Sequence, residues 1–266
     1  MQNSNNVATV DKSRHSKVRI KPNPDFVHAK DFNLVGVTLG ELSACTSNYP
    51  VMFIQNPDNK QFRLVAMLGL RPGENMYYGK DGWDCTYVPL SIQRHPFVIG
   101  FDDRVDDNRQ LATCLDGNSA FINEKEGLPL FNEAGEETDF MQSRHRMIAQ
   151  IFEGEKFTER FTNKLTELDL LAPFELIMRP QGGEVRKVTG MHTVSERKLK
   201  ELQPEQLQEL HKLDFLPACY IILGSVFQLH QLMKLRNRKG DEQVADYRIE
   251  LQPAAAAANA DNSGTA

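Results

Sequence analysis

The sequence has few cysteines, one tryptophan and no long apolar run. No two cysteines form a C-x-x-C pair, so neither a zinc ribbon nor a dithiol redox centre is expected, and buried free thiols in a reducing compartment are predicted instead. The longest apolar run, Ala218–Phe227 with two small interruptions, is far shorter than the roughly 20 residues of a membrane span. No apolar stretch of about 7–15 residues follows the first positive charges. We therefore predict a soluble, cytoplasmic protein without a signal peptide or transmembrane segment.

Catalytic and cofactor motifs are also missing. The chain contains no G-x-x-x-x-G-K-[ST] phosphate loop, no G-x-G-x-x-G dinucleotide fingerprint and no G-x-S-x-G nucleophile elbow. None of the seven histidines begins H-E-x-x-H, H-x-D or H-x-E, which disfavours the common zinc and iron sites. Ser195 and Lys198 match S-x-x-K, but we interpret Ser195 as a helix cap. No catalytic residue, metal or cofactor is predicted.

Charge is unevenly distributed along the chain. Lys plus Arg number 31 against 36 Asp plus Glu, a net charge of −5 that argues against a constitutive nucleic-acid binder. The start of the chain is basic, and residues 1–24 are predicted to be a basic disordered arm. Residues 237–266 end in an Ala-rich polar segment and are predicted to be a disordered tail. The acidic run at 102–107 is interpreted as a solvated hairpin tip.

The hydrophobic periodicity changes near residue 135. Before it, short apolar runs at 49–54, 62–70, 97–101 and 110–115 predict two hairpins. After it, helical spacing predicts two helices separated at Gly154, then a late hairpin turning at 181–183 and further helices, the last (218–235) packed in the interior. We predict an α+β fold with antiparallel β hairpins in the N-terminal half, helices with one late hairpin in the C-terminal half, and a single core over residues 25–236.

Two loops combine aromatic, Pro, Gly and charged residues, a composition typical of binding loops. The first, residues 69–78, carries Arg71 and Glu74, and the second, residues 87–97, carries Tyr87, Arg94 and His95. Forked guanidinium donors and flat rings could orient an anionic or sugar-like ligand. The alternative interpretation is that these residues are turn and packing signals. The five residues are the candidate ligand-binding set.

The same loops resemble a known family. Gly69-Leu-Arg-Pro-Gly-Glu-Asn75 and Tyr87-Val-Pro89 followed by Arg94-His-Pro-Phe97 resemble the SapC family of bacterial proteins, as do Leu130–Glu136 and Thr189–Val194. The resemblance runs from about residue 25 to 236. It implies an accessory protein associated with the surface layer, of a kind often encoded near flavin-dependent tryptophan-halogenase-like proteins and outer-membrane receptors.

The resemblance carries over no catalytic residue. We expect an accessory or binding protein for surface-layer or nutrient-uptake functions, with a protein partner or a small, sugar-like ligand and with no nucleic acid. The alternative is a cytoplasmic enzyme, or a subunit that works with a flavin-dependent tryptophan-halogenase-like protein. A surface location would require export by a non-classical route, because no signal peptide is predicted.

Overall fold

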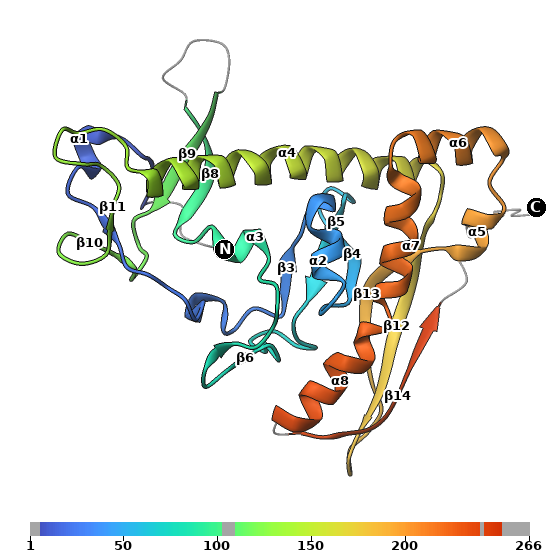
Figure 1. The fold of residues 1–266 in the computed structure, drawn as a ribbon. Helices are drawn as coiled ribbons and strands as arrows, with labels where there is room; N and C mark the ends of the chain where they lie inside the picture. Colours follow the sequence, from blue (N-terminus) through green and yellow to red (C-terminus); the bar gives the residue numbers. More distant parts are fainter. Residues whose placement is uncertain (1–5, 103–109, 240–241, 252–266) are drawn as a thin grey trace, which may run out of the picture.

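The structure is a computed structural model that describes residues 6–102, 110–239 and 242–251. It confirms the α+β prediction, with antiparallel sheets mostly in the N-terminal half and helices with late strands in the C-terminal part (Figure 1). Most of the acidic run at 102–107 lies outside the described residues.

A six-stranded antiparallel sheet forms the larger part of the molecule. Its strands lie in the order β14-β12-β13-β4-β5-β3. Their bounds are Val244–Leu251, Leu171–Pro180, Arg186–Val194, Val51–Gln55, Phe62–Met67 and Leu34–Gly36. The predicted hairpins β4–β5 and β12–β13 both pair as neighbours in this sheet, because a local turn joins strands whose apolar residues face one core.

Three smaller sheets complete the β structure. One has the order β1-β9-β8, from Val7–Thr9, Gln110–Asp116 and Phe97–Asp102, and contains the second predicted hairpin. Another has the order β10-β2-β11, from Ile122–Asn123, Arg19–Ile20 and Leu128–Pro129. The third is the pair β6 (Tyr78–Gly79) and β7 (Gly82–Trp83).

The prediction of a disordered arm over residues 1–24 is wrong for the described residues 6–24. They form β1, the short helix α1 (Lys12–His15) and β2. β1 pairs with β9 about 105 residues later, where Thr9 lies opposite Cys114, and Ile20 in β2 is buried. The local composition is basic, but the apolar residues of this segment find partners far along the chain, which local patterns do not reveal.

The predicted tail over residues 237–266 is also wrong in its first part. Helix α8 (Gln228–Lys239) continues past residue 237, and β14 pairs with β12 along most of its length. Val244, Tyr247 and Ile249 supply apolar side chains, and charged residues between them face outward, as in a half-exposed strand. The rest of the predicted tail lies outside the described residues.

Helix α4 (Asp139–Glu167) is one continuous helix of 29 residues, not the two predicted ones. The side chain of Thr138 caps its N-terminus by accepting from the Met141 amide. Gly154 lies in its middle, where an added Cβ would be 3.0 Å from Thr38 Cβ and Cγ2. The glycine therefore permits a close approach between α4 and the segment before β4, and does not end a helix.

The last helices cover the sheet. After α5 (Glu196–Lys200) and α6 (Pro204–Lys212), helices α7 (Phe215–Ser225) and α8 pack against the six-stranded sheet (Figure 1). Among the described residues, one helical segment, Phe215–Lys239, is long and apolar enough by length and composition alone to cross a membrane, and 39% of its apolar window is buried. Core helices pass the same test. The predicted interior packing is only partial, because Tyr220 and Phe227 are 50% and 70% exposed.

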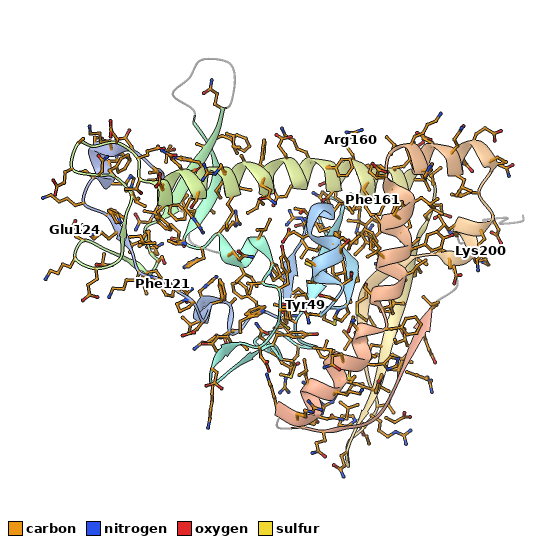
Figure 2. The ribbon with its side chains drawn as sticks, in the orientation of Figure 1. Tyr49, Phe121, Glu124, Arg160, Phe161 and Lys200 are labelled. Carbon is orange, nitrogen blue, oxygen red and sulfur yellow. The ribbon has the colours of Figure 1, made fainter. Side chains whose placement is uncertain are left out.

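The buried apolar residues form two clusters rather than one core. The larger cluster lies between the six-stranded sheet, α7, α8 and the C-terminal half of α4, and we call this part the sheet region. The smaller cluster lies under the N-terminal half of α4, in what we call the small region. Its members are Ile20, Phe97, Leu115, Leu130, Phe131, Met141 and Ile148. α4 is the element that contributes to both clusters, and in Figure 2 Phe161 lies on its sheet-facing side while Arg160 lies on its outer side.

Candidate functional site

A cavity of about 370 Å³ lies where the middle of α4 crosses the β3 edge of the six-stranded sheet. We call it the α4 cavity. One wall is α4, and the other is formed by β5, the 3₁₀ turn Leu39–Glu41 and the start of the short helix α3 (Leu90–Gln93). Its polar and charged lining side chains are Thr38, Glu41, Gln61, Arg63, Ser91, Glu155, Thr158, Glu159, Thr162 and Asn163.

Glu41 lies at the buried side of this cavity and is only 4% exposed. One carboxylate oxygen accepts from the amide and hydroxyl of Thr38, at 3.1 and 3.0 Å. The other accepts from the Tyr87 hydroxyl at 2.9 Å and the Leu90 amide at 2.7 Å. Four donors therefore stabilise a buried carboxylate, and its hydrogen-bonding capacity serves the fold.

The hydroxyl groups of the cavity are also engaged within the protein. Thr158 donates to the Gly154 carbonyl at 2.7 Å and accepts from the Leu39 amide at 2.9 Å. Ser91 donates to the carbonyl of Gly36 at 2.7 Å. These bonds fasten α4 to the 3₁₀ turn and α3 to β3, so the walls of the cavity are held in place by its own lining.

The charged groups at the mouth are different. The side chains of Arg63, Glu155 and Glu159, and of the neutral Asn163, make no hydrogen bond or close ion pair with the residues that the structure describes. Glu155 is exposed at the mouth, yet desolvation by the surrounding protein raises its pKa, against the opposing effects of Arg94 and Arg63. The mouth of the cavity thus presents two carboxylates on α4 and a guanidinium on β5 whose side chains are not tied down by hydrogen bonds to the described residues.

Two of the predicted residues lie behind this cavity. The Tyr87 hydroxyl donates a hydrogen bond to Glu41. Burial, and to a smaller extent the negative charge of Glu41, raises the pKa of the Tyr87 phenol, so the hydroxyl stays protonated and remains a donor. Arg94 is half-buried, and burial lowers its pKa while the charge of Glu155 opposes that shift. Neither side chain lines the cavity, and each acts on a carboxylate that does.

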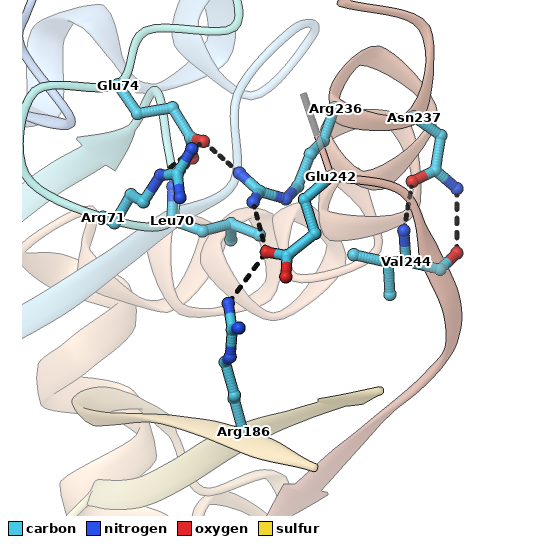
Figure 3. Close-up of polar contacts among 8 residues, drawn as sticks. All are labelled: Leu70, Arg71, Glu74, Arg186, Arg236, Asn237, Glu242 and Val244. Carbon is cyan, nitrogen blue, oxygen red and sulfur yellow. Dashed lines mark hydrogen bonds and ion pairs between the residues drawn. The ribbon is translucent and has the colours of Figure 1, made fainter. Parts of the chain in front are cut away.

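Arg71 and Glu74 lie elsewhere, in a buried ion-pair cluster at the end of α8 (Figure 3). Glu74 accepts from the Leu70 amide at 2.8 Å, pairs with Arg71 at 3.3 Å and contacts Arg236 of α8. Arg236 is 3% exposed and also lies 3.5 Å from Glu242. Arg71 and Glu74 are two of the predicted ligand-binding residues; they form an ion pair with each other, and Glu74 also neutralises a buried arginine and is closed off from solvent.

His95 occupies a third place. Its ring stacks on His28, with centroids 4.1 Å apart, and its Nε2 lies 2.9 Å from the Ser119 hydroxyl. Burial lowers the pKa of both rings, to about 4 for His28. The five predicted residues are therefore distributed over three places and do not converge on one cavity. Within the described ranges, no group of three or more His, Cys, Asp or Glu side chains could hold a metal ion.

None of the residues that line the cavity is among the five predicted from the sequence, although Thr38 and Glu41 lie in a recognisable local pattern. Thr38 and Glu41 match the S/T-x-x-E capping box, and both reciprocal bonds of that box are present. Arg63 and Glu155 come from a strand and a helix separated by 92 positions, and no local pattern links them.

Fold and cavity together define a class: an α+β protein with a polar cavity between a long helix and a sheet edge. No curated protein and no solved structure matches this chain. A family model does. The model of the SapC family matches residues 10–232, so the chain belongs to the SapC family and the resemblance seen in its loops is confirmed. The match begins within the segment that forms α1 and β2, in agreement with the ordered packing of that segment.

Proposed function

We propose that this SapC-family protein is an accessory binding protein in surface-layer or nutrient-uptake functions, and that its ligand binds in the α4 cavity. The observation that carries the proposal is that some lining residues are used by hydrogen bonds within the protein and others are not. Glu41, Ser91 and Thr158 are engaged by structural hydrogen bonds, while the side chains of Arg63, Glu155 and Glu159 have no hydrogen-bond partner among the described residues.

The chemistry of the lining supports binding over catalysis. Among the described residues that line the cavity, none is a His, Cys or Lys. The buried carboxylate Glu41 accepts four hydrogen bonds, an arrangement suited to a structural role rather than to proton transfer.

The charges at the mouth, the carboxylates of Glu155 and Glu159 and the guanidinium of Arg63, favour a small ligand that carries both an ammonium and a carboxylate group. A ligand ammonium would approach Glu155, and a ligand carboxylate would approach the planar donors of Arg63. Asn163 and Gln61 add amide groups at the same mouth. A volume of about 370 Å³ is in the range of small-molecule sites.

Isothermal titration with a panel of free α-amino acids tests the proposal. At least one amino acid should bind, and its N-acetyl and amide derivatives should bind at least about tenfold more weakly, because each lacks one of the two charges. Glu155→Gln and Arg63→Gln should each weaken binding by a similar factor.

Glu153→Gln is the matched control. Glu153 lies on the same helix and pairs with Lys156 at 2.9 Å, outside the cavity, so affinity should not change. Absence of binding across the panel, or unchanged affinity in both cavity variants, would contradict the proposal.

The alternative role with a flavin-dependent tryptophan-halogenase-like protein has its own test. A binding protein alone should change neither the rate nor the product of such an enzyme when the two purified proteins are mixed. A reproducible change in turnover would favour the role as a subunit.

A further inference from the structure

A second cavity of about 370 Å³ lies against α8, beside the segment that follows α2 (Leu42–Cys45). We call it the α8 cavity. It shares no lining residue with the α4 cavity. Its walls are α8, the segment after α2, and the segment after β7, and its lining consists of Ser47, Asn48, Tyr77, Asp84, Cys85, Gln228, Gln231, Leu235 and Arg238.

Helix α8 presents two different faces. Leu229, Leu232, Met233 and Arg236 are buried in the sheet region. A second set of α8 residues lines the cavity: Gln228, Gln231, Leu235 and Arg238. These positions are three or four residues apart, so they lie on one face of the helix, next to the buried face. A helix that covers a sheet needs only one inward face, so this second, mainly amide and cationic face is available for another purpose.

Part of the lining is fixed by the fold. The Gln228 amide nitrogen donates to the Thr46 carbonyl at 3.1 Å, which leaves its side-chain oxygen as an acceptor. The Asn48 side-chain oxygen accepts from Thr86 at 2.7 Å, which leaves its amide nitrogen as a donor. These bonds fix which end of each amide faces the cavity.

The charges of the cavity sum to one uncompensated cation. Asp84 pairs with Lys239 at 3.0 Å, so those two charges offset each other. Arg238 is exposed and makes no hydrogen bond or ion pair within the described part of the chain. Burial raises the pKa of Cys85 to about 11, so its thiol is a neutral group at physiological pH.

We propose that the α8 cavity binds a small acidic sugar, a ligand that combines several hydroxyl groups with one carboxylate. Alternating amide donors and acceptors suit hydroxyl groups, each of which both donates and accepts. The guanidinium of Arg238 suits a carboxylate through two parallel hydrogen bonds. Tyr77 is 1% exposed, so hydrogen bonds rather than ring stacking would provide the recognition.

The chain supplies a reporter for this site. Its single tryptophan, Trp83, directly precedes Asp84 and donates to the Tyr49 hydroxyl at 2.9 Å. Titration of the full chain with D-galacturonate, followed by tryptophan fluorescence and by calorimetry, should give a saturable signal. D-galactose, which has the hydroxyl groups alone, and acetate, which has the carboxylate alone, should each bind at least about tenfold more weakly.

Two variants separate the contribution of the ligand carboxylate from that of the ligand hydroxyl groups. Arg238→Gln should weaken galacturonate binding about tenfold or more and leave galactose binding unchanged, whereas Gln231→Ala should weaken both. Both side chains are exposed, so thermal unfolding should match that of the wild type. Arg248→Gln, which removes an exposed arginine from β14 outside the cavity, is the matched control and should bind galacturonate normally.

The outcome is independent of the function proposed for the α4 cavity. Glu155→Gln should weaken amino-acid binding about tenfold and leave galacturonate binding unchanged. If galacturonate bound no better than galactose and acetate, or if Arg238→Gln bound it as well as the wild type, the acidic-sugar site would be ruled out.

Discussion

The sheet region and the small region are built in different ways. In the sheet region, strands of up to ten residues pair along most of their length, and buried charges such as Glu41 and Glu74 have several partners each. In the small region, β2, β10 and β11 have two residues each, β8 and β9 have six and seven, and the cluster depends on Met141 and Ile148 of α4. Short strands and a small cluster bury little apolar area, so the small region should open first.

The largest expected effect comes from truncating the α4 residues of the two clusters. Phe161 contacts Phe53 and Phe215 in the sheet region, and Phe161→Ala should lower the free energy of unfolding by about 4 kcal/mol in a denaturant titration. Met141→Ala should cost about 2–3 kcal/mol. Hydrogen exchange should then accelerate in β1, β8 and β9 while β4 and β5 stay protected. Equal acceleration in both regions would show that they open as one unit.

A smaller effect tests the crossing point at the middle of α4. In a helix interior with free space around the glycine, Gly154→Ala would stabilise the protein by up to about 1 kcal/mol. Because the added methyl group would meet Thr38, we expect destabilisation by about 1–2 kcal/mol instead. Gly224→Ala in α7 is the matched control, since a Cβ there meets nothing within 4 Å and should stabilise. Stabilisation by both substitutions would overturn the close approach.

The smallest expected effect concerns the stacked rings of His28 and His95, which link the sheet region to the small region. His28 precedes β3 and His95 precedes β8, and burial lowers the pKa of both rings, to about 4 for His28. Asp116 opposes and Arg94 reinforces the shift at His95. As the pH falls, the unfolded chain therefore binds protons at a higher pH than the folded chain does. The free energy of unfolding should rise with pH between about 4 and 6.5 and decrease on acidification. His28→Gln should flatten this slope in unfolding curves, and an unchanged slope would assign it to other groups.

The elements that could be predicted from the sequence are those whose partners lie close along the chain. The β4–β5 and β12–β13 hairpins are joined by turn-forming residues, and their apolar runs identify both strands. β1, β2 and β14 were missed because each pairs with a strand far away in the sequence. Their short apolar patterns are hidden within basic or polar segments.

The candidate site shows the same limit. Arg71 and Glu74 were predicted to contact a ligand from one loop, but they form an ion pair with each other, and the burial of Glu74 beside Arg236 depends on α8, 162 residues later. Arg63 and Glu155 meet only because α4 crosses the sheet edge. Spacing identifies which residues can interact locally, while exposure to a ligand depends on tertiary packing.

The continuity of α4 constrains how this chain can change in length. The helix must present Met141 and Ile148 to one cluster and Phe161 and Leu165 to the other. One residue inserted or deleted between them would rotate the second set by about 100° relative to the first. Insertions of about seven or eleven residues, near whole numbers of turns, would keep both sets facing inward but lengthen the helix. Related sequences should therefore vary in length at their loops and keep the distance between these two pairs of residues fixed.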